Sequence, residues 1–161
     1  MGNEALPAVS AIPGLQPLYT SRIDIAPPLD VGNGPHGQRR VINILGGAFA
    51  GPRLSGRVLP GGADWQMVRS DGSVEVSARY TLETHDGALI YVGNWGLRRG
   101  PPEVIARLAA GDSVDASEYY FRTTPVFETG ATEYAWLNGI IAVAAGERRA
   151  DAVIITAYEL T

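Results

Sequence analysis

The residues that could do chemistry in this sequence are a few polar side chains set into otherwise apolar stretches. One stretch, Tyr119 to Thr129 (YYFRTTPVFET), carries Arg122 and Glu128 at the same parity if Pro125 introduces no bulge. A charged side chain that faces the inside of a protein must be paired or bound, because burying it alone is very costly. The arginine could bind an oxyanion or a carboxylate of a substrate, and the glutamate could transfer a proton. Together they would suit an acid/base enzyme that acts on a small molecule.

Four further polar or aromatic residues could join this pair. Asp64 lies beside Trp65, Asn94 ends an apolar strand, and Tyr80 and Tyr91 fall on facing strands of a predicted hairpin. A carboxyl group whose pKa is raised by an apolar pocket is a suitable general acid or base, and a tyrosine can offer a hydroxyl from an apolar body. We therefore expect Asp64, Tyr80 and Asn94 to line one mouth or floor of the fold together with Arg122 and Glu128.

The predicted catalytic set is Asp64, Glu128, Arg122 and Tyr80. Asp64 or Glu128 would be the acid/base and Arg122 the anion clamp, while Tyr80 and Asn94 would orient the substrate. A structural alternative stands beside this hypothesis: Arg122 can form an ion pair with Glu128 or Asp64, and the tyrosines can be core residues.

Arginine also occurs in three adjacent pairs. They are Arg39-Arg40, Arg98-Arg99 and Arg148-Arg149. The last two pairs are typical of solvated faces. The first fits the start of a strand, whose successive side chains point to opposite sides.

The remaining composition excludes several classes of protein. The chain has 161 residues, no cysteine and two histidines, and it contains none of the standard catalytic or phosphate-binding motifs, so we expect no metal and no organic cofactor. A net charge of −4 without a long basic run argues against nucleic-acid binding. No apolar run approaches the roughly 20 residues of a membrane span. We expect a cytoplasmic protein that binds a small molecule and contacts no membrane.

Strands must position these polar residues. Alternation over Val74 to Thr84 is the clearest period-two pattern, and Asp-Gly turns at 71–72 and 86–87 join it to its neighbours as a meander. The one convincing helix is Pro101 to Ala110, which is either a fixed cap or a mobile lid. Between predicted strands at 38–45 and 64–69, the glycine-rich segment Gly46 to Trp65 indicates an ordered, sharply turning crossing.

About nine or ten strands are expected against this one helix, and several are apolar on both faces. Either a sandwich or a closed antiparallel β-barrel can bury such strands, and we favour the all-β barrel because it leaves no unpaired edges. A homo-oligomer would cover part of the outer wall. Residues 1–14 are expected to be a flexible arm, and residues 15–161 a single barrel domain.

Three segments resemble one known family. They are GQRRVINILGGAFAGPRLSGRVLPGGADW, ARYTLETHDGALIYVGNWG and YYFRTTPVFETGATEYAWLN. In this order they are similar to the bacterial and fungal family DUF3237, also called the UPF0311 proteins, over nearly the whole chain from Leu15 to Leu160. The resemblance implies a calycin-like or allene-oxide-cyclase-like barrel, often oligomeric, without an agreed mechanism. It also brings residues into the expected substrate-binding set, which is Arg53, Trp65, Tyr91, Asn94, Phe127, Tyr134 and Asn138.

Three functions remain open at this stage. The first is a cofactor-independent isomerase, cyclase or lyase that moves a proton on a small, oxygenated, partly apolar metabolite. The second is a lipocalin-like binding protein that uses the same pocket without turnover. The third is a structural oligomer whose barrel is filled by its own side chains, and the volume of the cavity separates it from the other two.

Overall fold

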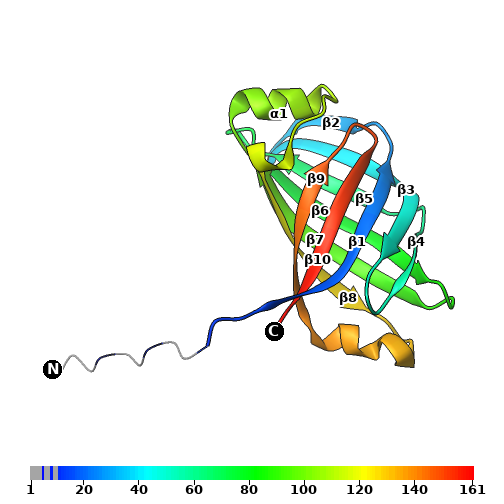
Figure 1. The fold of residues 1–161 in the computed structure, drawn as a ribbon. Coiled ribbons are helices and arrows are strands. Elements are labelled where there is room, and N and C mark those ends of the chain that lie inside the picture. Colours follow the sequence, from blue (N-terminus) through cyan, green and yellow to red (C-terminus); the bar gives the residue numbers. More distant parts are fainter. Residues whose placement is uncertain (1–4, 6–7, 9–10) are drawn as a thin grey trace.

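The alternating pattern of the sequence forms ten strands in the computed structural model, which describes residues 5, 8 and 11–161 (Figure 1). The strands are β1 (Leu15–Ile25), β2 (Leu29–Gly34), β3 (Gly37–Ala50), β4 (Ser55–Val58), β5 (Ala63–Val68), β6 (Val74–Thr84), β7 (Leu89–Arg99), β8 (Tyr120–Glu128), β9 (Ile141–Arg148) and β10 (Ala152–Leu160). The helical elements are α1 (Pro102–Ala109) and two short 3-10 helices, η1 (Ala116–Glu118) and η2 (Thr132–Gly139).

The strands close into a barrel in which every pairing is antiparallel. The order around the wall is β1, β10, β9, β8, β7 and β6, and β3 then returns to β1. The two short strands β4 and β5 both lie between β6 and β3. Each pairs with both of these neighbours, but along different parts of their length. The predicted closed barrel is therefore confirmed, and β2 lies outside the ring as a hairpin with the first half of β3.

The glycine-rich segment begins inside a strand. The second strand, expected to end at residue 45, continues to Ala50 because β3 changes partners along its length, from β2 and β5 to β1 and β4. Gly46 and Gly47 have φ of 140° and 145°, in the left-handed region that favours glycine. A Cβ on Gly47 would also collide with the carbonyl oxygen of Arg22. These glycines let two backbones approach closely where the wall bends.

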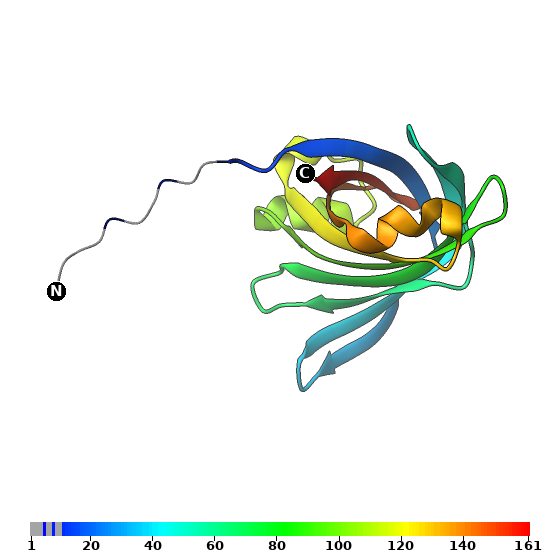
Figure 2. The same cartoon turned by 90° about the horizontal axis from the view of Figure 1, so that it is seen from below.

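The two ends of the barrel are closed differently. The helix η2 lies across the lower opening and buries Tyr134 and Leu137 (Figure 2). At the opposite end α1 lies over the barrel and is anchored by the buried side chains of Val104 and Leu108. The α1 end is the one through which a hollow reaches the interior.

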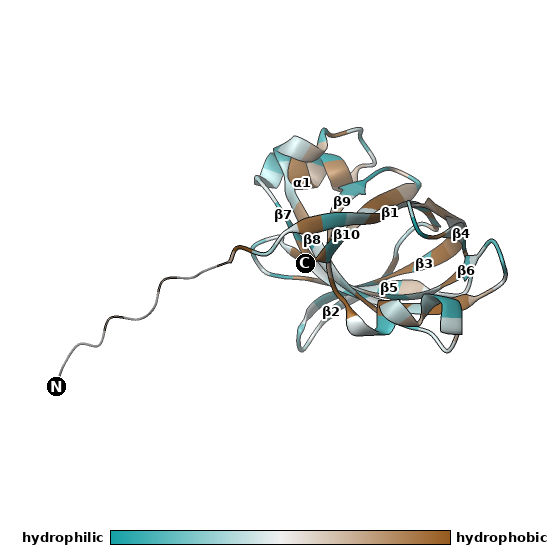
Figure 3. Cartoon of the chain, turned by 60° about the horizontal axis from the view of Figure 1, so that its bottom comes forward, coloured by the Kyte–Doolittle hydropathy of each residue, from teal (hydrophilic) through white to brown (hydrophobic). Residues whose placement is uncertain are grey.

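Hydrophobic and hydrophilic residues alternate along the strands that enclose the barrel (Figure 3). In the part of the chain that the structure describes, no helix is both long enough and apolar enough to span a membrane. The expected arm, residues 1–14, falls mostly on residues outside the described part. The division into an arm and one domain stays a prediction.

Candidate ligand-binding site

The barrel interior keeps a small cavity among apolar and polar side chains. Its volume is about 40 Å³, which exceeds the roughly 10–15 Å³ that a cavity needs to hold one water molecule but is far below the roughly 300–1,000 Å³ of a usual ligand pocket. Its polar lining consists of Asp64, Gln66, Tyr80, Asn94, Arg98 and Arg148, and isoleucines of β1, β3 and β10 supply much of the rest. The barrel is thus nearly filled by its own side chains, and a ligand of any size must lie in part outside this cavity.

A larger cleft lies directly outside, between α1 and the barrel rim. Its volume is about 300 Å³, which is the lower end of the usual range for small-molecule sites. The cleft is bordered by the C-terminal end of α1 (108–111), by the loop residues Pro27 and Pro28, and by the side chain of Arg40. The cleft and the inner cavity share Ile25, Ile42, Gln66, Arg98 and Arg148 in their linings. They therefore form one path from the surface to the interior, which we call the mouth.

Asp64 lies in this path at a point where the pairing of two strands is interrupted. The strands β5 and β6 pair on both sides of Trp65 and Gln66 but not at these two residues. Asp64 Oδ1 fills the gap by accepting the backbone N–H of Ser77 at 2.8 Å, and Oδ2 accepts the side-chain amide of Gln66 at 2.7 Å. Gln66 Oε1 in turn accepts Arg40 Nη2 at 3.0 Å. Four residues thus form one hydrogen-bonded chain from the rim to the interior.

The pKa of the Asp64 carboxyl group is raised. Burial is the main cause, and it is opposed by the hydrogen bonds from Gln66 and Ser77 and by the charges of Arg98 and Arg40. A carboxyl group that takes up a proton more readily than usual, next to a cavity, is suited to general acid/base work.

Three arginines from three strands converge on the mouth: Arg40 of β3, Arg98 of β7 and Arg148 of β9. Arg98 is 6% exposed, and its Nε and that of Arg40 are buried with no hydrogen-bond partner among the described residues. Burial, with the charges of Arg148 and Arg40, lowers the pKa of Arg98 to about 10. Burial and the charge of Arg40 likewise lower the pKa of Arg148.

This positive charge has little to balance it. None of the ion pairs within 4.0 Å in the described part of the chain includes Arg40, Arg98 or Arg148. Asp151 lies at the rim, but its carboxylate is paired with Arg22 at 3.3 Å. Asp64 is the remaining carboxylate in the lining of the two hollows. A protein with a net charge of −4 therefore keeps an excess of positive charge at one largely buried place.

Deeper in the barrel, Tyr80 and Asn94 meet Tyr19. Tyr19 and Asn94 both influence the proton affinity of Tyr80, whose pKa is raised mainly by burial. Within the described residues Tyr19 Oη, Tyr80 Oη and Asn94 Oδ1 are buried without a hydrogen-bond partner. Native proteins leave few such groups unpaired, so each one needs a reason such as a ligand or a water molecule.

The structure brings together three of the predicted residues, Asp64, Tyr80 and Asn94. The expectation that Arg122 and Glu128 face the interior is wrong. The two residues do lie on the same face of β8, but that face is exposed. The buried face of β8 is the opposite one, which includes Phe121 and Phe127. Arg122 and Glu128 are exposed on the outer wall, so their side chains do not line the internal site.

The other predicted binding residues are also spread over the molecule. Trp65 and Tyr91 are exposed on the outer wall, and Phe127 is a core residue that packs edge-on against Tyr19. Three lie at the lower end. Arg53 pairs with Glu159 at 2.6 Å, the Tyr134 hydroxyl donates to Asp86 at 3.0 Å, and Asn138 exchanges two hydrogen bonds with Thr129. None of these six residues lines the inner cavity or the cleft with Asp64. Trp65 and Tyr91 instead line a separate outer hollow, and the contacts of Arg53, Tyr134 and Asn138 lie around η2.

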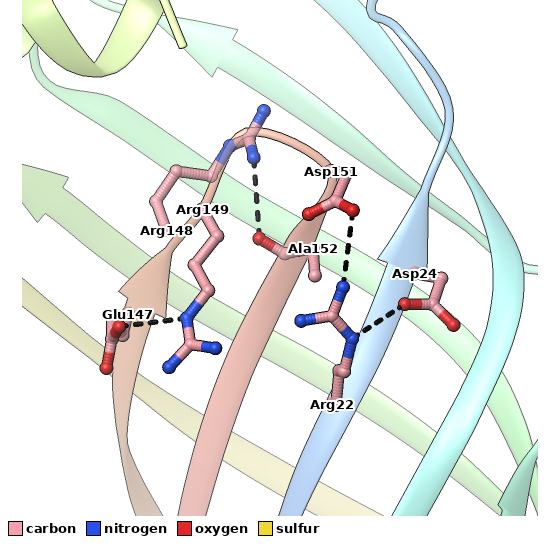
Figure 4. Close-up of polar contacts among 7 residues, drawn as sticks. All are labelled: Arg22, Asp24, Glu147, Arg148, Arg149, Asp151 and Ala152. Carbon is pink, nitrogen blue, oxygen red and sulfur yellow. Dashed lines mark hydrogen bonds and ion pairs between the residues drawn. The ribbon is translucent and has the colours of Figure 1, made fainter. Parts of the chain in front are cut away.

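The arginines of the mouth were missed because two arginine pairs were interpreted as solvated. Arg99 is exposed, as expected, but Arg98 is buried. In Figure 4 the Arg149 guanidinium group contacts Glu147 on the outside, whereas Arg148 turns to the carbonyl oxygen of Ala152. The available signal was parity: Arg98 continues the inward series of Ile90, Val92 and Asn94. The opposite orientations expected for Arg39 and Arg40 fit their separate contacts, with Trp65 O and Gln66 Oε1.

A third hollow, larger than the inner cavity and the cleft, lies outside the barrel. About 640 Å³ of open groove lies along the outer wall where β8 and β9 pair over only two residues, and its lining includes the exposed side chains of Trp95 and Tyr120. It holds no carboxylate in its lining. Across the described part of the chain, no three His, Cys, Asp or Glu side chains gather as a metal site would require.

Comparisons with known proteins agree with the fold. The model of a family described as "Protein of unknown function (DUF3237)" matches residues 13–160. A UPF0311 protein of Rhodopseudomonas palustris is 44% identical over 142 residues, which are 88% of this chain and 91% of the relative. A crystal structure of a beta-barrel like protein from Acinetobacter baumannii has a TM-score of 0.84 and 43% identity, covering 96% of this chain and 100% of the other.

A more distant structure shares the fold alone. It is described as an enzyme from Penicillium herquei, with a TM-score of 0.73 and 20% identity over 97% of this chain and 100% of the other.

Proposed function

We propose that this chain, which belongs to the DUF3237 family, is an enzyme that moves a proton on a small, oxygenated, partly apolar metabolite. The reaction would be that of an isomerase, cyclase or lyase. The observation that supports this proposal is the carboxyl group of Asp64, with its raised pKa, beside an inner cavity that opens through the mouth.

In this proposal Asp64 is the general acid/base. It takes a proton from a carbon or oxygen atom next to a carbonyl group of the substrate and returns it to another atom of the same molecule. Charge then develops on the carbonyl oxygen, and a preorganised donor is needed there. The buried hydroxyl of Tyr80 is such a donor, and Asn94 holds the substrate beside it.

The surroundings suit such a step. The isoleucines of the lining give the reacting atoms apolar surroundings, which strengthen electrostatic interactions in the site. The neighbour from Penicillium herquei is described as an enzyme. That description favours catalysis on this fold only by analogy, because a fold hosts many functions.

The experiment compares wild type with D64N and E128Q in a bacterial small-metabolite extract prepared in D₂O. Mass spectrometry then follows every metabolite that is consumed, formed or deuterated. Wild type and E128Q should change the same metabolite, and D64N should change it at least about 100-fold more slowly, the scale of a lost acid/base. An unchanged extract, or equal rates for D64N and wild type, would refute the proposal.

A binding protein without turnover is the second candidate. It is favoured by one observation, that both oxygens of Asp64 already accept hydrogen bonds, from Ser77 and Gln66. In that case a ligand should co-purify with the protein and should survive the D64N substitution, as native mass spectrometry would detect.

We also propose that the chain forms a homo-oligomer. Large apolar side chains are exposed on the outer wall, among them Trp95 at 50%, Val126 at 67% and Ile141 at 69%. Exposed large apolar side chains on the neighbouring strands β7, β8 and β9 are typical of protein contact surfaces. The cytoplasmic location stays a prediction.

A further inference from the structure

No carboxylate pairs within 4.0 Å with any of the three arginines of the mouth among the described residues, although Arg40 donates to Gln66 Oε1 and Arg148 donates to the carbonyl oxygen of Ala152. Buried charges are normally paired, since an isolated one costs several kcal/mol even after relaxation. Arg98 is the extreme case, because it is the most buried of the three and its Nε has no acceptor. Its guanidinium carbon lies 5.7 Å from the centre of the Phe121 ring, a cation–π contact that supplies no hydrogen-bond acceptor to the Nε–H group.

Neighbouring groups make the cost larger. Arg40 and Arg148 both repel Arg98, and Arg40 repels Arg148. Asp64 lies near enough to attract Arg98, but it forms no ion pair with it within 4.0 Å. The buried Nε–H groups of Arg98 and Arg40 therefore have no acceptor among the described residues, although both side chains line the same cleft.

We propose that the mouth is a carboxylate-binding site, in which Arg98, Arg40 and Arg148 hold the carboxylate of a small organic acid whose other end reaches toward Asp64. This inference rests on the proposed function, because it names the substrate class of the same site. Guanidinium groups bind carboxylates through parallel hydrogen bonds, which also fix the orientation of the ligand.

The lining supports an organic acid with an apolar body. Beside the arginines, the path is lined by Ile25, Ile42, Pro27, Pro28 and Leu108, which suit hydrocarbon or an aromatic ring. About 300 Å³ in the outer part and 40 Å³ in the inner part leave room for a compact molecule only.

A bound carboxylate would also act on Asp64. The charges of Arg98 and Arg40 lower the pKa of Asp64, against the effect of burial. An anion on these arginines offsets their charge, so the pKa of Asp64 rises further when the ligand binds. The acid/base would thus become a better proton acceptor only when the site is occupied.

The test uses NMR of the arginine Nε–H groups of the full chain. Acetate, benzoate and phenylacetate are titrated at constant ionic strength against their neutral amides and inorganic phosphate. We expect at least one carboxylate to shift the Arg98 and Arg40 signals saturably, and the amides to leave them in place. Substitution Arg98→Met should weaken that binding by about 10- to 100-fold, the value of a charged hydrogen bond.

Arg99→Met is the matched control, because Arg99 is the exposed neighbour of Arg98 and stacks on Tyr120 outside. Arg148→Gln provides a second variant if the first one misfolds. Carboxylate binding should persist in D64N, so a lost turnover and a lost anion site are distinguishable. Saturation by none of the carboxylates, stronger binding of phosphate, or unchanged binding in both Arg98→Met and Arg148→Gln would overturn the proposal.

Discussion

The carboxylate of Asp64 substitutes for a strand partner of Ser77: Oδ1 accepts the Ser77 N–H at 2.8 Å where β5 and β6 are not paired. The same side chain lines the inner cavity and has a raised pKa. One side chain therefore carries both a structural role and the proposed chemical role, and different substitutions are needed to separate the two.

Asp64→Ala should be less stable than Asp64→Asn by about 1–3 kcal/mol, because it leaves the Ser77 N–H and the Gln66 amide without an acceptor. An asparagine retains one oxygen that can accept the Ser77 N–H. Urea unfolding of the two variants at neutral pH measures the difference. Equal midpoints and equal slopes would show that the hydrogen bond to Ser77 contributes nothing.

The stability of wild type relative to D64N should fall as the pH rises. Burial raises the pKa of Asp64, so the folded protein keeps this proton to a higher pH than the unfolded chain does. The stability gained from the protonated carboxyl group is complete below the unfolded pKa of about 3.9 and is lost as the pH rises through the folded pKa. Urea midpoints of both proteins from acid to neutral pH provide the comparison. A difference that rises with pH would mean that the arginines outweigh burial.

Changes on the outer wall should leave both stability and chemistry intact. Arg122→Gln and Glu128→Gln alter exposed side chains without ion-pair partners in the described part of the chain, so each should shift the unfolding free energy by no more than about 0.5 kcal/mol. Turnover in the metabolite extract should match wild type. A large loss in either variant would place an active centre outside the barrel.

Local patterns predicted the architecture well where turns limit the strands. The strand expected at 74–84 has the same bounds as β6, because Asp-Gly turns with Gly72 and Gly87 at positive φ end it on both sides. The closed barrel followed from strands that are apolar on both faces. The pairing of β1 with β3, which closes the ring, depends on residues far apart in the chain and carries no local signal.

The site was predicted only in its inner half. Asp64, Tyr80 and Asn94 interrupt apolar series, so their polarity is conspicuous in the sequence. Arg98 lies beyond the predicted end of its strand and beside Arg99, a setting that usually means solvent. Its burial depends on α1 and on strands from elsewhere in the chain, which cover the mouth. The parity of the strand indicated that Arg98 faces inward, but hydrophobic periodicity alone does not predict that a charged side chain is buried.

The mass of the protein in solution tests the proposed oligomer. Light scattering should give a multiple of the 17.1 kDa chain, and Val126→Lys should shift the mass toward that of a single chain, since a lysine in an apolar contact must be desolvated. Glu103→Lys, an exposed change on α1 at the other end of the barrel, is the control. A wild-type mass of one chain would exclude the oligomer.

Arg98→Met should make the ligand-free protein more stable, although it destroys the proposed anion site. Replacing a buried, poorly paired charge by an apolar side chain of similar length removes its desolvation cost, which is worth about 1–4 kcal/mol in comparable cases. It also relieves the repulsion from Arg40 and Arg148. Urea unfolding in chloride buffer without carboxylates measures the gain, and Arg99→Met should stay within about 0.5 kcal/mol of wild type. If Arg98→Met is instead destabilised by several kcal/mol, Arg98 is a structural residue that the fold itself requires. If Arg98 serves to bind the ligand, Arg98→Met should increase the stability of the protein and weaken its carboxylate binding.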